Sequence, residues 1–216
     1  MGQMKSQASR VVLIGDVVDS RGAANRRALH RAVEKALVDV NAVVPSLGEL
    51  RVTVGDEFQG AYATLGGAIE AALRVHLELL PGVDTRFGLG RGAVTTLDAR
   101  RGIEDGPGWW AAREAIEAAA QSAGSAATRT TRTAVRAADD DPTVAAVNAA
   151  LLCRDHLVGS LSDRSLRLLR GLMDPHTTQS ELATLEGISA SAVSQRVRAD
   201  GIGAVLAAHE LLRALP

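Results

Sequence analysis

The order of hydrophobic patterns in the first 95 residues constrains the fold of this 216-residue chain most strongly. Apolar side chains recur at helical spacing over residues 25–40 and 65–80. Short β-branched or alternating runs are typical of strands, and they occupy residues 11–18, 50–54, 58–62 and 84–94. The resulting order, β-α-β-β-α-β, predicts an α+β fold with a ferredoxin-like split unit, whose helices cover one face of the sheet.

The remainder of the chain is predicted to be mainly helical. Residues 109–123 form an alanine-rich helix, and residues 128–138 form one more edge strand. Five helical stretches follow, at 143–160, 163–173, 179–186, 190–200 and 203–215. We therefore expect a ferredoxin-like domain at 1–138 and an all-α domain at 139–216 that contains a helix-turn-helix.

Composition and charge exclude several classes of protein. No run of 18 apolar residues exists, so the sequence predicts no membrane span and no membrane partner. The net charge of −1 gives no overall attraction to nucleic acid, so any DNA binding must be local. A lone cysteine, Cys153, excludes an internal disulfide and a cysteine-based zinc site. Because this usage fits a reducing compartment, we expect a cytoplasmic protein.

Acidic residues lie at the ends of two predicted strands. Asp16 ends the first apolar strand, and Asp56 and Glu57 lie at the turn of the predicted hairpin. Because this strand and the hairpin lie side by side in the predicted topology, we expect Asp16 and Asp56 to converge. Converging carboxylates attract Mg²⁺ or Mn²⁺, and Asp19 and Glu57 complete the candidate metal ligands. The alternative is that Asp56 is merely a turn residue and Asp16 merely ends its strand.

Two further motifs favour an anion or a nucleotide. In RFGLGRG at 86–92, glycines alternate within a strand, which indicates close approach of either a ligand or a packed helix. In GPGWWAARE at 106–114, free N–H groups at a helix start favour an anion. A base can stack on either tryptophan of this motif, or both can belong to the core. The candidate nucleotide-binding residues are Arg86, Gly88, Gly106, Trp109 and Arg113.

Residues 177–198 have the pattern of a helix-turn-helix. Apolar residues line one seam, Gly187 makes the turn and Ser189 caps the second helix. The polar side chains face outward, where they can contact base edges or phosphates. The candidate DNA-binding residues are Thr178, Gln179, Ser191, Ser194, Gln195 and Arg198. Residues 151–216 carry seven arginines and seven acidic residues, so a dimerisation or partner-binding role is the alternative.

With these motifs the chain resembles the SatD family of bacterial proteins. The matching stretches are IGDVVDSR at 14–21, VGDEFQG at 54–60, RFGLGRG at 86–92, DGPGWWAAREA at 105–115 and TQSELATLEGISASAVSQRVR at 178–198. The five motifs follow one another in order, and the resemblance spans nearly the whole chain.

The first four motifs also resemble, more distantly, the catalytic domain of class III nucleotide cyclases and the GGDEF diguanylate cyclases. This resemblance implies a nucleotide-cyclase-like domain in which Asp16 and Asp56 bind two metal ions over a nucleoside triphosphate. It also implies that Arg113 is the catalytic arginine that stabilises the transition state. Cyclases have an asparagine where this chain has Trp109, and GDEF at 55–58 lacks the second glycine of GGDEF. Metal and phosphate binding therefore agree with the resemblance better than cyclisation does.

The sequence supports three hypotheses. The favoured one is a transcriptional regulator, in which a nucleotide- and metal-binding domain controls a DNA-binding helix-turn-helix. The second is a Mg²⁺- or Mn²⁺-dependent nucleotidyl transferase or cyclase, and the third is a non-catalytic interaction module. We expect a homodimer, because cyclase-type sites often form between subunits and DNA sites of this kind are often palindromic.

Overall fold

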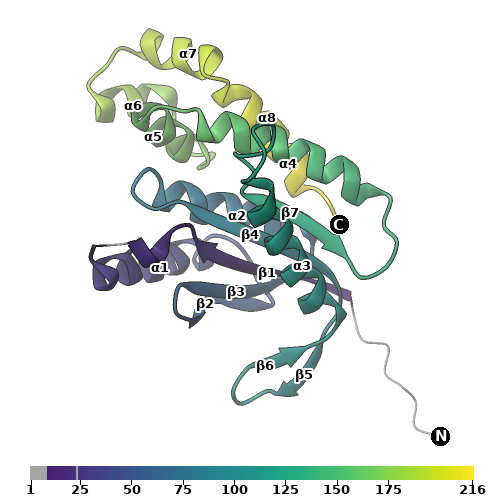
Figure 1. The fold of residues 1–216 in the computed structure, drawn as a ribbon. Helices are drawn as coiled ribbons and strands as arrows, with labels where there is room; N and C mark the ends of the chain where they lie inside the picture. The colour runs from purple at the N-terminus through teal and green to yellow at the C-terminus, as the bar shows by residue number, and fades with distance from the viewer. Residues whose placement is uncertain (1–8, 23) are drawn as a thin grey trace, which may run out of the picture.

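The computed structural model describes residues 9–22 and 24–216, which form a mixed α/β fold with a five-stranded sheet and eight α-helices (Figure 1). The first part consists of β1 (Ser9–Val17), a 3-10 turn (Ser20–Gly22), α1 (Arg26–Asn41), β2 (Gly48–Val54), β3 (Glu57–Tyr62), α2 (Leu65–Leu79) and β4 (Thr85–Ala93). Next come β5 (Thr95–Asp98), β6 (Ile103–Asp105), α3 (Pro107–Ser122) and β7 (Thr133–Ala137). The last helices are α4 (Thr143–Gly159), α5 (Asp163–Leu172), α6 (Gln179–Glu186), α7 (Ala190–Ala199) and α8 (Ile202–Arg213).

The strands of the main sheet are arranged in the order β2-β3-β1-β4-β7. All neighbouring pairs are antiparallel except β4 and β7, which are parallel. The element order β1-α1-β2-β3-α2-β4 agrees with the predicted order, and β7 is the edge strand predicted within 128–138. The assignment to the ferredoxin-like class stays a prediction.

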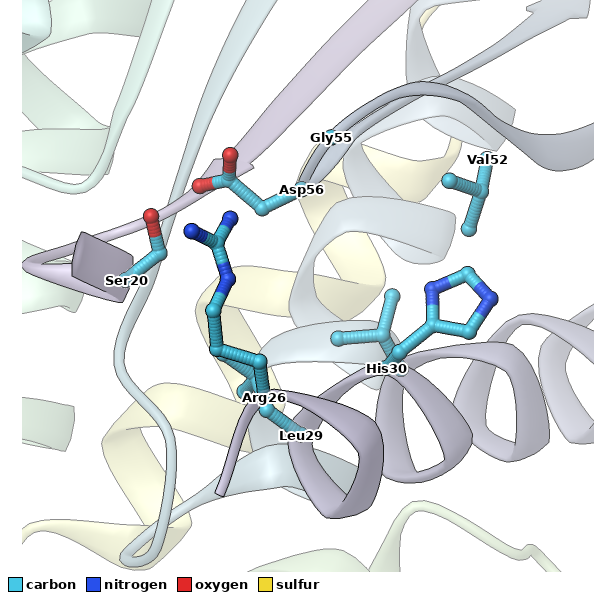
Figure 2. Close-up of a pocket in the computed structure, with 8 residues that line it drawn as sticks. Ser20, Arg26, Leu29, His30, Val52, Gly55 and Asp56 are labelled. Atoms are coloured by element: carbon cyan, nitrogen blue, oxygen red, sulfur yellow. The ribbon is translucent and has the colours of Figure 1, made fainter. Parts of the chain in front are cut away.

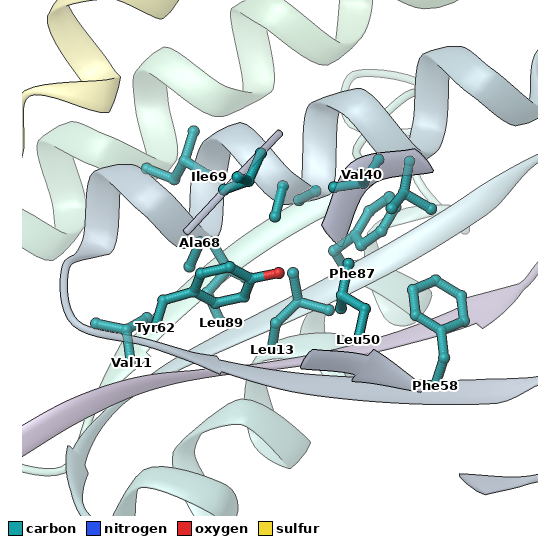
Figure 3. Close-up of a cluster of buried hydrophobic side chains, with 14 of the residues drawn as sticks. Val11, Leu13, Val40, Leu50, Phe58, Tyr62, Ala68, Ile69, Phe87 and Leu89 are labelled. Carbon is teal, nitrogen blue, oxygen red and sulfur yellow. The ribbon is translucent and has the colours of Figure 1, made fainter. Parts of the chain in front are cut away.

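The two faces of the sheet are covered by different helices. On one face, Leu13, Phe58 and Phe87 pack into a cluster with apolar residues of α1 and α2 (Figure 3). The rings of Phe58 and Phe87 meet edge to face, with centroids 6.0 Å apart. On the other face, Val12 and Ile14 pack against α3. Because side chains alternate along a strand, odd-numbered residues of β1 face α1 and α2, and even-numbered residues face α3.

The C-terminal helices share the core of the sheet. Val147 and Leu151 of α4 and Leu212 of α8 belong to the same cluster as the sheet residues. A second cluster packs helices α5, α6, α7 and α8 against the C-terminal half of α2, through residues such as Leu73 and Val193. The predicted boundary between 138 and 139 falls between β7 and α4, and it stays a prediction.

The β5–β6 hairpin is the main element that the sequence pattern did not predict. Its strands hold only four and three residues and show no apolar alternation, so they give no periodic signal. The carboxylate of Asp98 accepts the backbone N–H groups of Arg100 and Arg101, which shapes the turn. Arg51 of β2 donates to the carbonyl of Gly102 at 2.7 Å and fixes the turn to the sheet. The hairpin projects from the body of the molecule (Figure 1).

No described helix is both long and apolar enough to span a membrane.

Glycines in β4 allow α3 to lie directly on the strand. A Cβ atom at Gly88 would overlap the carbonyl of Ala112 and the amide nitrogen of Ile116. A Cβ atom at Gly90 would overlap the carbonyl of Gly108. Backbone therefore meets backbone along this contact, so the glycine run has the packed-helix role that the sequence left open.

A buried polar cluster lies between β4, β7, α2, α4 and α8. Arg154 and Asp155 form an ion pair at 3.0 Å with side chains only 2% and 3% exposed. The Asp155 carboxylate also accepts the N–H groups of Arg132 and Thr133. Both ring nitrogens of the buried His209 and Nη1 of Arg154 have no hydrogen-bond partner among the described residues. Burial lowers the pKa of His209 to about 4, and the charge of Arg154 acts in the same direction.

Replacing His209 should flatten the pH dependence of stability. A histidine whose folded pKa lies below its unfolded value near 6.5 binds fewer protons when folded. Its contribution is therefore present above pH ~6.5 and is lost as the pH falls toward 4. In urea unfolding, the free energy of unfolding of His209→Leu should fall by about 3 kcal/mol less than that of wild type between pH ~6.5 and ~4. His156→Leu, at an exposed histidine of α4, should follow wild type; equal slopes for all three proteins would contradict the assignment.

Gly88→Ala should destabilise the ligand-free chain, because the added methyl group forces α3 away from β4. We expect the free energy of unfolding to fall by about 1–3 kcal/mol. Gly22→Ala is the matched control, since a Cβ there meets nothing within 4 Å. Equal stability of the two variants would show that α3 does not pack this closely.

Candidate functional site

Two arginine–carboxylate pairs lie on the face of the sheet that α3 covers. Asp16 of β1 is paired across the sheet with Arg86 of β4, and the guanidinium donates to both carboxylate oxygens at 3.1 Å. Arg113 of α3 donates to both oxygens of Glu57 at 2.7 and 2.8 Å. The hydrogen bond to Glu57 raises the pKa of Arg113, and the nearby charge of Asp16 acts in the same direction. The two pairs are thus neighbours that form one electrostatic site.

Asp56 lies on a different side of the hairpin turn. It follows Gly55, whose φ of 67° fits the left-handed region that favours glycine. Its carboxylate faces the guanidinium of Arg26 at the start of α1, with Ser20 beside it (Figure 2). These residues and His30 line a small pocket between α1 and the hairpin. The remaining metal candidate, Asp19, is exposed in the β1–α1 connection, with φ of 54°.

The predicted metal ligands do not form a single set in this arrangement. Asp16 and Glu57 each bind a guanidinium through both oxygens, whereas Asp56 faces α1. Within residues 9–22 and 24–216, no three His, Cys, Asp or Glu side chains lie together so that they could hold a metal ion. The described side chains alone therefore do not fit a metal centre, and the convergence of Asp16 with Asp56 stays a prediction.

A groove of about 470 Å³ lies between α3 and the β5–β6 hairpin. Its lining residues are Ile14, Gln59, Glu104, Trp109, Trp110, Arg113 and Glu114. Ile14 and Gln59 are paired on neighbouring strands and come from the sheet, Glu104 comes from the hairpin, and the others come from α3. Aromatic, amide and carboxylate groups thus meet in one concave surface, as in small-molecule sites.

The two tryptophans have different environments. Trp109 is half-buried against the apolar cluster under α3, and its Nε1–H is buried without a partner among the described residues. Trp110 is 59% exposed, and its Nε1–H donates to Asp105. Trp109 therefore lies both at the core and at the groove, whereas Trp110 is not a core residue.

The other nucleotide-binding candidates, Arg86, Gly88 and Gly106, do not line the groove. Arg86 lies at the Asp16 pair, and Gly106 is the N-cap of α3, with φ of 131°. Gly88 lies beneath α3 and not at the groove. Sequence reasoning missed Gln59, Glu104 and Glu114 as lining residues. Only Gln59 gave a usable signal, since it alternates with the buried Phe58 and Gly60 along β3.

Helices α6 and α7 contain all the candidate DNA-binding residues except Thr178, the N-cap of α6. Thr178 and Glu181 form a capping box, Gly187 ends α6 with φ of 64°, and Ser189 caps α7. Val193 of α7 is fully buried in the helical cluster. Ser191, Gln195 and Arg198 are exposed, whereas Gln179 and Ser194 are half-buried. Helix α7 lies on the side of the helical part that faces away from the sheet (Figure 1).

Comparisons with known proteins give a family and solved structures to which the chain is similar. No curated protein sequence matches the chain. Among solved structures, the chain is similar to a regulator of polyketide synthase expression from Bifidobacterium adolescentis. The identity is 13%, the match covers 96% of this chain and 86% of that chain, and the TM-score is 0.30. The model of the SatD family matches residues 10–215, so the chain belongs to the SatD family.

Proposed function

We propose that this SatD family chain is a transcriptional regulator that binds DNA through α6 and α7 and a nucleotide through the groove beside α3. The single observation that carries the proposal is the exposed polar face of α7. Its buried side fixes the helix through Val193, while Ser191, Gln195 and Arg198 are exposed on the surface. Helices that read the major groove need such a face of hydrogen-bonding side chains on a rigid support.

The short turn before α7 supports the same role. Gly187 and Ser189 place α7 at a fixed angle to α6; both helices pack on α5, and α7 also packs on α8. Arg164 and Arg167 of α5 are both paired with Glu186, and Arg196 of α7 lies 3.8 Å from Asp200. Arg198 of α7 is exposed and has no ion pair among the described residues. Binding would then depend on few phosphate contacts and on base contacts of α7.

DNA binding should depend on the polar face of α7. A labelled duplex from the gene's own promoter should bind in fluorescence anisotropy, with affinity that falls as salt rises. Gln195→Ala/Arg198→Ala should weaken binding by about tenfold or more, and should reduce the salt slope by about one. Arg129→Ala removes the same charge from an exposed arginine outside α6 and α7, and should bind as wild type does. Equal losses in both variants, or no salt-sensitive binding at all, would contradict the proposal.

The groove supports the ligand half of the proposal. Arg113 lines the groove and Arg86 lies in the neighbouring pair with Asp16; both have planar guanidinium groups of the geometry that phosphate oxygens accept, and the face of a tryptophan can carry a base. Because the described acidic side chains form no metal centre of their own, we propose that Mg²⁺ or Mn²⁺ enters only with the phosphates. The pairing of Asp16 and Glu57 with arginines favours binding over cyclase or transferase chemistry.

Nucleotides should stabilise the chain in a way that requires Arg113. In a thermal-shift panel of nucleoside mono-, di- and triphosphates, a ligand at 100 times its Kd should add about 2.7 kcal/mol of stability. We expect no shift from Mg²⁺ alone and a larger shift from nucleotide with Mg²⁺. Arg113→Gln should abolish the nucleotide shift, and Arg129→Gln should retain it. If no nucleotide raises the unfolding temperature of the wild-type protein, the proposed nucleotide binding is wrong, whatever the result of the DNA-binding experiment.

A further inference from the structure

The β5–β6 hairpin, residues 95–105, exposes apolar side chains on a projecting arm. Leu97 is 65% exposed and Ile103 is 45% exposed, although both are large and apolar. Trp110, at the start of α3, is 59% exposed and is joined to this hairpin through its hydrogen bond to Asp105. Three large apolar side chains are thus exposed on the arm and on the first turn of the helix that is joined to it, and exposed apolar side chains are typical of protein interfaces.

The outer surface of α3 carries a stripe that continues from Trp110. Residues 110, 114, 117 and 121 follow helical spacing, and their side chains are exposed. Glu114 and Glu117 form no hydrogen bond or ion pair among the described residues, and the charge of Glu117 helps to raise the pKa of Arg113 one turn earlier. At the tip of the arm Arg100 and Arg101 are both exposed, and Arg101 lies 3.8 Å from the carboxylate of Asp98, so residues 98–101 keep a net positive charge. The acidic stripe and the basic tip are complementary in charge, and both belong to the same chain.

The arm is held in place before any partner arrives. Arg51 fixes its turn through the carbonyl of Gly102, and Arg10 pairs with Glu104 at 3.3 Å. Asp98 binds the turn from within the arm. Binding of a partner therefore does not have to order the arm, because contacts within the chain already hold it in place.

We propose that a second copy of this chain docks on this surface, with the arm of each copy lying along the outer stripe of α3 of the other. The arm projects beyond the N-terminal end of α3, so arm and stripe extend in opposite directions from Trp110 (Figure 1). A two-fold axis near Trp110 therefore brings each arm onto the other copy's stripe, which is the self-complementary contact that a symmetric dimer needs. Leu97 and Ile103 then pack near Trp110 of the second copy, and its Glu114 and Glu117 face Arg100 and Arg101. This places the second copy at the mouth of the groove.

The association state of the full chain tests this surface. Sedimentation velocity over a range of concentrations should give a dimer for wild type. Leu97→Asp and Arg101→Glu/Arg100→Glu should each raise the dimer dissociation constant by about tenfold or more. Adding Glu114→Arg/Glu117→Arg to the arginine variant should restore the dimer, because both charged partners are then reversed.

Two exposed leucines outside the surface serve as controls. Leu211→Asp on α8 and Leu185→Asp on α6 carry the same change at side chains that are 77% and 78% exposed, and both should remain dimeric. A monomeric wild type at every concentration would overturn the proposal. The proposal would also be overturned if Leu185→Asp dissociated the dimer while Leu97→Asp left it intact, because the helix-turn-helix would then be the interface. Circular dichroism of each variant shows whether a loss of dimer comes from unfolding.

Discussion

The arrangement of the site depends on the close contact of α3 with β4. Glycine at every second position of β4 removes the side chains that would keep the helix away, and Ala112 and Gly108 of α3 meet the strand there. This contact fixes the helix axis over β4, and from that position Arg113 reaches across the sheet to Glu57. Side chains at these strand positions would hold the helix farther from the strand. Arg86 lies on the same strand face as the glycines, so its pair with Asp16 becomes a neighbour of the Arg113 pair.

The two faces of the sheet are built from side chains of different size. Leu13, Phe58, Tyr62 and Phe87 fill the face that α1 and α2 cover. The buried residues of α3 are small, apart from Ile116, and are Gly108, Ala111, Ala112, Ala115 and Ala119. Because small residues bury little area, α3 leaves part of its face of the sheet uncovered. The groove and the two ion pairs occupy the space that large side chains fill on the other face.

Periodicity predicted the regular elements, because long amphipathic runs such as 65–80 carry their own signal. It failed for the β5–β6 hairpin, whose short polar strands are held by Arg51 and Arg10 from distant parts of the chain. The pairing of Asp16 with Arg86 was likewise hidden, since it depends on a strand register that joins residues 70 positions apart. The exposure of Trp110 could have been predicted from the sequence. The small apolar residues at 108, 111, 112, 115 and 119 define the buried stripe of α3, and position 110 lies outside it.

Burial separates two kinds of arginine–carboxylate pair in this chain. Arg154 and Asp155 are almost fully buried, and removing either partner would leave an unpaired charge in the core, so this pair is part of the fold. The pairs of Asp16 with Arg86 and Glu57 with Arg113 are partly exposed, and such pairs typically contribute only about 0–1 kcal/mol. A phosphate offers a guanidinium the same bidentate geometry as a carboxylate, so exchange at these pairs has a small net cost. Under the proposed nucleotide binding, the carboxylates released by this exchange would become available to the cation that accompanies the phosphates. The same two residue types thus belong to the core where water is excluded, and under the proposed nucleotide binding they form an exchangeable anion site where water has access.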